Sequence, residues 1–458
     1  MRNQDPETAV AAIVEPELLE RKFTELTSAI AGAFGRVEPR KAATGYLRGL
    51  LSEIPRKTCW DLSKYAGHMT PDVMQRLLSR AVWDEDTVRD AVRRYVIGHL
   101  ASTDAVLVLD ETGQEKKGTA TCGVGRQYTG TAGKVTNCIV AVYATYASPL
   151  GHALIDTELY VQRKYVDLPA TREAMGLPAD WRFATKPQLA QRIASRVLAA
   201  GVEVAWAAGD EVYGRDPKLR AFLEAQRIGY VLAVGVDFPV PTAASSHRAD
   251  HLAALVPARA WERRSCGAGS KGPRVYDWAM VATVGPRHVL LIRRSVSTPS
   301  ELAFFYCHVP EGRALTLPVL VRVAGVRWAV EEDFQQSKGQ VGLDHTQVRR
   351  YRSWRRHVIL AMAALAILAV VVAVERRRHP APVVPCTSQD APPDDYGLIA
   401  LTVPEIRRLL TVFSHVGTVV TPRVAALRRE FELRWSTWRR RHQARARWHR
   451  YRRRLALT

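Results

Sequence analysis

The sequence predicts an α/β protein: a mixed sheet with a β-rich insertion, preceded by a helical N-terminal domain and followed by a basic helical C-terminal tail. Three observations lead to this prediction. Apolar residues recur at helical spacing through residues 1–100, short apolar runs alternate with helical patterns from 101 onward, and arginine is concentrated near the C-terminus. With 458 residues the chain is long enough for several domains and a substantial core.

The first element is the helical domain, residues 1–100. Within it, residues 60–78 indicate a short helix, a glycine turn, and a new helix with Thr70 as its cap and Pro71 at its first position. That layout is typical of a DNA-binding helix-turn-helix, and an ordinary helical hairpin has the same pattern. In the DNA-binding case the second helix would offer three polar side chains: Gln75, Arg76 and Arg80.

The sheet is expected to begin in residues 101–236. The pattern there predicts three strands, a helix, a strand, a helix and a strand. This succession describes a mixed α/β sheet, and its order is similar to that of ribonuclease-H-like folds. The elements fall at 105–109, 137–146, 153–161, 189–198, 202–209, 216–226 and 230–234.

Frequent prolines interrupt the alternation over residues 237–318, although short strands are still expected at 275–281, 288–293 and 302–307. We interpret this stretch as a β-rich insertion. A helix over about 317–337 then resumes the sheet domain, whose second part covers 319–378. From 379 to 458, a proline-rich linker leads into an arginine-rich arm.

Residues Val358 to Val374 form a run of 17 consecutive apolar residues. The run is just short of a comfortable bilayer span, and clusters of basic residues flank both of its ends. No second span and no N-terminal signal accompany it. We therefore favour a helix buried against the sheet over a membrane helix.

Cysteine usage bears on metal sites and on the cellular compartment. The six cysteines include no C-x-x-C pair, so neither a zinc site nor a disulfide framework is indicated. A reducing cytosol fits this pattern best.

The charge of the chain is strongly positive and unevenly placed. The formal charge is +21, and 12 of the 66 basic residues are lysine, so arginine carries most of it. A GC-rich genome accounts for much of the ratio of arginine to lysine, but not for the location of the arginines. From His345 onward, 23 arginines stand against 7 acidic residues. This asymmetry predicts an arm that binds nucleic acid or an anionic membrane surface.

The arm from Arg423 to Arg454 places Trp435, Trp438, Trp448 and Tyr451 among 13 arginines. Aromatic faces interleaved with guanidinium groups suit base stacking and phosphate neutralisation together. We favour a helix that binds DNA without sequence preference, through residues such as Arg439, Arg440 and Arg441. A docked amphipathic helix is compatible with this and would use an apolar stripe: Leu427, Phe431, Trp435 and Trp438.

Three acidic residues stand out by position. Asp110 ends the apolar run 105–109, Asp210 ends the run 202–209, and Glu331 lies in a charged helix downstream. Carboxylates at strand ends sit where a sheet opens to solvent, and three that converge can hold hard divalent cations that serve phosphoryl transfer. The sequence therefore predicts a metal-dependent enzyme that acts on nucleic acid.

The helix around Glu331 has a patterned face. Helical spacing places Arg327, Glu331 and Lys338 on one stripe and rotates Glu332 away by about 100°. An acid flanked by cations suits a metal site beside a phosphate backbone, and a solvated ion-pair ladder has the same pattern. Glu332 and Asp333 compete with Glu331 as third ligand. Glu111 and Glu211 should point away from the metal, since strand neighbours face opposite sides.

A glycine-rich segment over residues 123–134 contains Arg126 and Lys134. We interpret it as a flexible basic loop that could approach a phosphate backbone. It lacks the G-x-x-x-x-G-K-[ST] spacing of a nucleotide-binding loop, so no nucleotide cofactor is expected.

Several segments together resemble one family. Residues 327–338 are similar to the R-(3)-E-(6)-K signature of DDE transposases of the IS4-like superfamily. The segments LDETGQEKKG (109–118), GVGRQYTG (123–130) and AGDEVYG (208–214) resemble its IS701-type branch. The similarity extends over roughly residues 40–370 in the right order, and this collinearity is more telling than any one motif.

The resemblance implies roles for individual residues. Asp110, Asp210 and Glu331 would be the metal-binding triad, and Arg327 and Lys338 would contact DNA at the transposon end. The family's Tyr three residues before the Arg falls on Ala324, so any stacking it provides must come from elsewhere, with Trp328 as a candidate.

The resemblance also implies an activity. It predicts a cut-and-paste DNA transposase that uses two Mg²⁺ ions, with Mn²⁺ as a substitute, and that works as a homodimer on double-stranded transposon-end and target DNA. The expected location is the bacterial cytoplasm, at the nucleoid and without a membrane partner. The alternative is a catalytically silent, transposase-derived DNA-binding protein or repressor.

Overall fold

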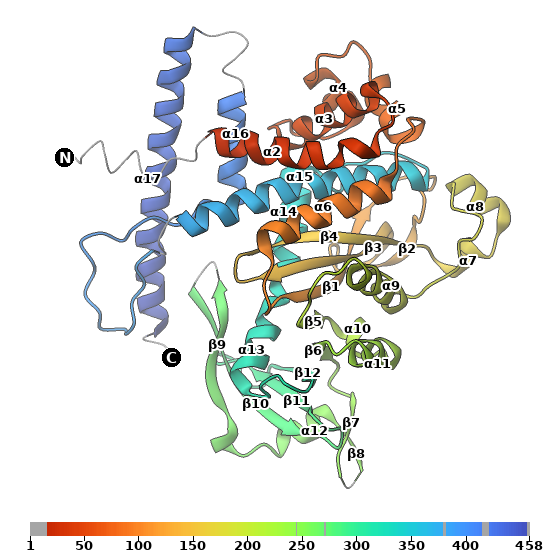
Figure 1. Cartoon of the computed structure of the whole chain (residues 1–458). Helices are drawn as coiled ribbons and strands as arrows, with labels where there is room; N and C mark the ends of the chain where they lie inside the picture. The colour runs from red at the N-terminus through yellow and green to blue at the C-terminus, as the bar shows by residue number, and fades with distance from the viewer. Residues whose placement is uncertain (1–15, 244, 270–271, 379–381, 415–420, 456–458) are drawn as a thin grey trace. The chain divides into compact units, whose positions relative to one another are not determined.

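A computed structural model describes residues 16–243, 245–269, 272–378, 382–414 and 421–455, which divide into two compact units (Figure 1). Unit 1 contains the described residues up to Leu100, the short piece Ala174–Leu177, and those from Phe334 onward. Unit 2 contains Ala101–Glu173 and Pro178–Asp333. The boundary at Asp333 falls within one helix, α14 (Trp328–Val341).

Unit 2 is built on a mixed sheet. Strand β1 pairs antiparallel with β3 and parallel with β5, β5 pairs parallel with β6, and β4 pairs antiparallel with β3. The resulting order β4-β3-β1-β5-β6 is that of a ribonuclease-H-like sheet, which confirms the predicted fold class. The five strands are β1 (Val106–Glu115), β3 (Lys134–Ser148), β4 (Gly151–Tyr160), β5 (Trp206–Gly209) and β6 (Gly229–Val234).

The strands predicted in the β-rich insertion are present, and they extend this same sheet. From β6 the order continues through β12, β11, β10 and β9, each antiparallel to the one before, to give a ten-stranded sheet. These strands are β9 (Glu262–Gly269), β10 (Gly272–Ala282), β11 (His288–Arg294) and β12 (Leu302–His308). Smaller elements precede them: β7 (Pro239–Pro241), β8 (Ser246–Arg248), α12 (Ala249–Ala254) and η2 (Ala258–Ala260).

The basic segment over residues 123–134 is a hairpin arm, which corrects the prediction of a flexible loop. Strand β2 (Gly125–Thr129) pairs with the start of β3, and a turn with Gly133 at φ +63° joins the two strands. A left-handed φ of this kind favours glycine. Arg126 and Lys134 are exposed on this hairpin.

Helices of unit 2 begin where the sequence supplies caps. Helix α9 (Lys186–Ala199) starts with a capping box of Thr185 and Gln188, and α11 (Pro217–Ala225) starts at the Asp216 cap followed by Pro217. Helix α9 packs on β1, β3 and β4, and α13 (Leu317–Val326) packs on β1, β5, β6 and β9. The remaining helices are α7 (Arg163–Val166), α8 (Pro169–Met175) and α10 (Glu211–Gly214).

The helix predicted over 317–337 is present as two helices that meet at Arg327. Helix α13 ends there and α14 starts at the next residue. Gly325 allows α13 to lie against the backbone of β9, because a Cβ atom at this position would be 1.9 Å from the carbonyl oxygen of Cys266. This close packing fixes the point from which α14 departs.

Unit 1 is helical, as predicted for its N-terminal part. Helix α5 begins at Asp72 with Pro71 as its cap residue, which corrects the prediction of Thr70 as cap, and Gly67 forms the turn before it at φ +80°. Gln75, Arg76 and Arg80 are exposed. The helices are α2 (Pro16–Ile30), η1 (Ala31–Ala33), α3 (Val37–Leu51), α4 (Cys59–Tyr65), α5 (Asp72–Ser79), α6 (Glu85–Leu100), α15 (Tyr351–Arg378), α16 (Val403–Ser414) and α17 (Pro422–Leu455).

The apolar run 358–374 lies in α15 and is buried inside unit 1 (Figure 1). Among the described residues, α15 is the one helix long and apolar enough to cross a membrane, and 94% of its apolar window is buried in the protein. Its main contacts are with α2, α3, α5, α6 and α16. The predicted burial is confirmed, and helices of the same unit supply its main contacts.

The arm forms the single long helix α17. Its second half is docked on its own unit, since Trp448 and Tyr451 are buried and Arg440 donates to the carbonyl oxygen of Ile399 at 2.7 Å. Arg440 is therefore not available as a DNA contact, which corrects that prediction. The stripe expected to dock the helix is instead exposed: Leu427, Phe431, Trp435 and Trp438.

Candidate active site

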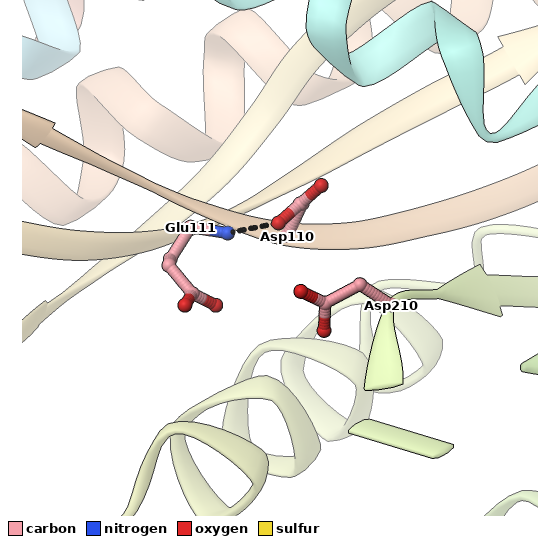
Figure 2. A group of neighbouring side chains, drawn as sticks. All are labelled: Asp110, Glu111 and Asp210. Carbon is pink, nitrogen blue, oxygen red and sulfur yellow. Dashed lines mark hydrogen bonds between the residues drawn. The ribbon is translucent and has the colours of Figure 1, made fainter. Parts of the chain in front are cut away.

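Two of the predicted acids meet in the middle of the sheet of unit 2 (Figure 2). Strands β1 and β5 are parallel neighbours, and Leu109 is paired with Gly209, so the next residue on each strand, Asp110 and Asp210, falls at the same level. Asp110 was predicted to lie at the end of its strand, but β1 continues to Glu115. Asp210 does follow the end of β5, and its carboxylate caps α10 by accepting from the amide of Val212 at 2.9 Å.

Glu111 joins these two acids. The ligand atoms of Asp110, Glu111 and Asp210 all lie within 4.8 Å of one another, a spacing that could hold a metal ion. Figure 2 shows that the side chains of Asp110 and Glu111 leave β1 in different directions, as strand alternation requires. Glu111 was expected to point away from the metal of Asp110; strand alternation holds, yet its carboxylate lies near both aspartates.

Glu111 is tied to the two elements beside it. Its carboxylate accepts from the ammonium group of Lys186 at 2.5 Å and from the hydroxyl of Tyr213 at 2.6 Å. Lys186 is the first residue of α9, and Tyr213 lies in α10, directly after Asp210. Glu111 thus fixes β1 relative to the helix that begins at Asp210.

Burial makes the charged form of this cluster costly. It raises the pKa of Asp110 to about 8; Arg327 lowers that pKa, and Asp210 and Glu111 add to the rise. Burial, followed by the charge of Glu111, also raises the pKa of Asp210. Carboxylates that repel one another in a poorly solvated place attract a cation.

Arg327 connects the two aspartates to Glu331. Its guanidinium lies 3.4 Å from a carboxylate oxygen of Asp110 and 3.5 Å from one of Glu331. A cation therefore already lies between the first and third predicted ligands. Glu331 is not part of the three-acid cluster of Asp110, and no contact between Glu331 and Asp210 is described.

Glu332 and Asp333 are engaged on another side of α14. Asp333 is fully buried and accepts from the hydroxyl of Thr145 at 2.8 Å, while His152 lies 2.8 Å from Asp333 and 3.1 Å from Glu332. Burial alone would lower the pKa of His152, but Asp333 and Glu332 raise it to about 10. The imidazolium thus holds both acids beside β3 and β4. Sequence reasoning missed His152 because it is a lone histidine after a turn, without a motif.

Replacing His152 with Ala is expected to lower the free energy of unfolding by roughly 3 kcal/mol at pH 7, since the buried carboxylate of Asp333 would lose its cation. The pKa of His152 is raised in the folded protein. Its contribution is therefore fully present below about pH 6.5 and lost as the pH rises through about 10. Urea unfolding at pH 7 and pH 10.5 measures both effects. An equal loss from His251→Ala, a mostly exposed histidine, would contradict this role.

The remaining predicted DNA contacts are distributed over the chain. Trp328 is exposed, with the guanidinium of Arg274 5.9 Å from its ring centre. Lys338 lies in α14 seven residues after Glu331, in the part assigned to unit 1. Arg439 is paired with Glu405 at 2.8 Å.

All six cysteines are free.

Residues 30–263 match a family described as DDE superfamily endonuclease. A protein of Microchaete diplosiphon named "Probable transposase for insertion sequence element IS701" is 28% identical over 189 residues, which are 41% of this chain and 46% of that relative. The chain thus spans about half the length of the relative it matches, and the resemblance to the IS701-type branch is confirmed.

A cryo-EM structure of a piggyBac transposase synaptic complex with hairpin DNA is similar with a TM-score of 0.45 and 10% sequence identity. The similarity covers 92% of this chain and 85% of that one.

Proposed function

The chain belongs to the DDE superfamily of endonucleases, and from that premise we propose that it is a DNA transposase that moves an insertion sequence by a cut-and-paste route. The observation that carries the proposal is that Asp110 and Asp210 lie side by side on adjacent parallel strands. Arg327 contacts both Asp110 and Glu331. A structural ion pair requires only one carboxylate. Here two carboxylates lie together on neighbouring strands and both have raised pKa values, which favours a site for an added cation.

The metal site is proposed to consist of Asp110, Asp210 and Glu331. The donors are all carboxylate oxygens, which Mg²⁺ prefers, with Mn²⁺ as a substitute. The crowding of acids around Asp110, together with the guanidinium already between Asp110 and Glu331, supports a cation site here. When bound, two Mg²⁺ ions would stabilise the attacking and leaving oxygens of an in-line displacement at phosphorus.

The residues around the acids are proposed to position DNA and ligands. Glu111, held by Lys186 and Tyr213, keeps Asp110 and Asp210 in register. Arg327 would turn from the carboxylates to a phosphate when cations occupy the site. Further DNA contacts are proposed for Lys338, Trp328, Arg126, Lys134, Gln75, Arg76, Arg80, Arg439 and Arg441.

The partners follow from this reaction. Two ends must be cut and joined, so we expect a homodimer on double-stranded DNA that carries transposon ends and target. No nucleotide cofactor and no membrane are required by the reaction. A basic DNA-acting protein with free cysteines suits the bacterial cytoplasm, at the nucleoid.

The proposal is tested by incubating the protein with DNA that contains the element's ends. We expect strand cleavage in Mg²⁺ or Mn²⁺, no cleavage in EDTA, and full cleavage with a zinc-specific chelator, because the site offers no His or Cys ligand. Full activity in EDTA would exclude the metal site. Metal-independent end binding without any cleavage would support the silent DNA-binding protein instead.

The exposed arginines of α17 give a separate prediction. The triple variant Arg423→Ala, Arg428→Ala, Arg429→Ala is expected to make the log–log salt dependence of DNA binding shallower, by about 0.9 for each phosphate that the variant no longer neutralises. Fluorescence anisotropy at several salt concentrations measures the slope. The control removes three exposed arginines elsewhere: Arg36, Arg94 and Arg259. Equal slopes in both triple variants would assign α17 to packing or to a protein partner.

A further inference from the structure

A pocket of about 460 Å³ lies within unit 1, among α3, α4, α5, the start of α15 and the loop before it. Its size falls in the range of small-molecule sites, which is about 300–1,000 Å³. Its lining contains no aspartate or glutamate. None of the proposed metal ligands lines this pocket, and of the DNA contacts proposed above its lining contains Gln75 alone.

Cations gather around this pocket. Arg349 and Arg350 line it on the loop before α15; both are exposed, and the described residues provide no ion pair for either. Lys57 forms part of the wall and is almost fully buried, and its ammonium group donates to the carbonyl oxygens of Gly49 and Ser52. Burial lowers the pKa of Lys57 to about 7, so this lysine is only partly charged at neutral pH and the two arginines carry most of the positive charge at the pocket.

An exposed aromatic side chain adjoins the cations. Trp60, the second residue of α4, lines the pocket and is 66% exposed. This exposure leaves the indole ring accessible to a ligand. A planar ring beside two free guanidinium groups offers one surface to a base and another to a phosphate.

The remaining lining residues supply hydrogen-bonding groups. Gln75 and Ser79 are four residues apart on α5, so they share the face that lines the pocket. Arg76 and Arg80 share the adjacent face, rotated by about 100°. A strand whose phosphates lie along Arg76 and Arg80 would therefore pass the mouth of the pocket, where Gln75 can meet a base edge.

We propose that this pocket binds one unpaired nucleotide of a DNA strand, with its base stacked on Trp60 and its phosphates on Arg349 and Arg350. A base outside the duplex can enter such a site and be read on its edge. The inference rests on DNA being the partner, as in the proposed function, but it does not depend on cleavage.

The test compares two DNA probes of the same sequence at one salt concentration: a fully paired duplex, and the duplex with a short single-strand gap. The full chain should bind the gapped duplex more tightly. Trp60→Ala should reduce that preference by about fivefold or more, the least that stacking of one base contributes, and Trp60→Phe should restore most of it. Binding of the fully paired duplex should change little in both variants.

The proposed phosphate contacts of Arg349 and Arg350 are tested with the same two probes. The double variant Arg349→Ala, Arg350→Ala should weaken binding to the gapped duplex more than to the paired one. Arg94→Ala, at an exposed arginine of the same unit outside the pocket, should leave the preference for the gapped duplex unchanged. A free nucleoside monophosphate that abolishes the gap preference at low concentration would show that the pocket serves a free nucleotide, which overturns the proposal.

Photocrosslinking gives a readout that does not depend on variants. A 5-iodouracil base placed in the gap should crosslink to the peptide that contains Trp60. The proposal is overturned if the wild type has no preference for the gap, if Trp60→Ala keeps the preference, or if the crosslink maps outside the pocket. Metal-dependent cleavage measured in the same preparations separates failure of the pocket from failure of the transposase assignment.

Discussion

Glu331→Gln is expected to reduce DNA cleavage by several orders of magnitude, whereas Glu332→Gln should keep most of the activity. Glu331 shares Arg327 with Asp110 and would lose a metal-binding oxygen while keeping its shape. Glu332 points to His152, 3.1 Å away, so its replacement removes one exposed partner of a structural imidazolium. Single-turnover cleavage of end-containing DNA measures both effects.

Binding of the same DNA supplies the control for this pair of variants. Glu331→Gln should leave end binding largely unchanged, because no cation that meets a phosphate is removed. Arg327→Ala should weaken binding to the cleaved end more than binding to random DNA. An inactive Glu332→Gln with an active Glu331→Gln would mean that the third ligand lies one residue further on and that α14 rotates in the complex.

Periodicity predicted the sheet well because each strand carries its own signal. The runs that became β1, β3, β4, β5 and β6 are apolar, short and bounded by turn residues, so each could be located without its neighbours. The register that brings Asp110 level with Asp210 follows from β1 and β5 being parallel neighbours. That relation could be expected from the order of elements alone.

The predictions that failed concern packing between segments that are distant in the sequence. The apolar run in α15 carries no information about its partners, which within its own unit are mainly the helices α2, α3, α5, α6 and α16. The arm of α17 has two apolar faces: one, through Trp448, is buried, and the other, through Trp435, is exposed. Sequence alone could not choose between these faces, because both have helical spacing.

The site shows the same limit. Alternation along β1 correctly separated the directions of Asp110 and Glu111 but could not show that α9 and α10 would bring Lys186 and Tyr213 to Glu111. His152 contacts two of the three consecutive acids in α14, Glu332 and Asp333, which supports the proposal of Glu331 as the third ligand. No pattern in the sequence marks that histidine.

Asp110→Asn is expected to abolish cleavage and, in buffer without divalent cations, to raise the melting temperature by several degrees. Burial raises the pKa of Asp110 to about 8, far above the value of about 3.9 in an unfolded chain. The folded state therefore binds a proton more tightly than the unfolded state between these values. The ionised carboxylate of Asp110 therefore lowers the free energy of unfolding by a few kcal/mol at neutral pH, and this destabilisation decreases as the pH falls from 8 toward 4.

Divalent cations should reverse this order. Mg²⁺ that binds the folded wild type offsets the cost and raises its melting temperature with concentration, while Asp110→Asn, which lacks the central ligand, should respond little. Calorimetric scans at pH 5 and pH 7.5, with and without Mg²⁺, measure the shifts, and Asp180→Asn, an exposed acid of the same unit, is the control. If Asp110→Asn melts below the wild type without metal, the buried carboxylate stabilises the fold. Asp110 would then belong to a structural ion pair with Arg327 rather than to a metal-binding site.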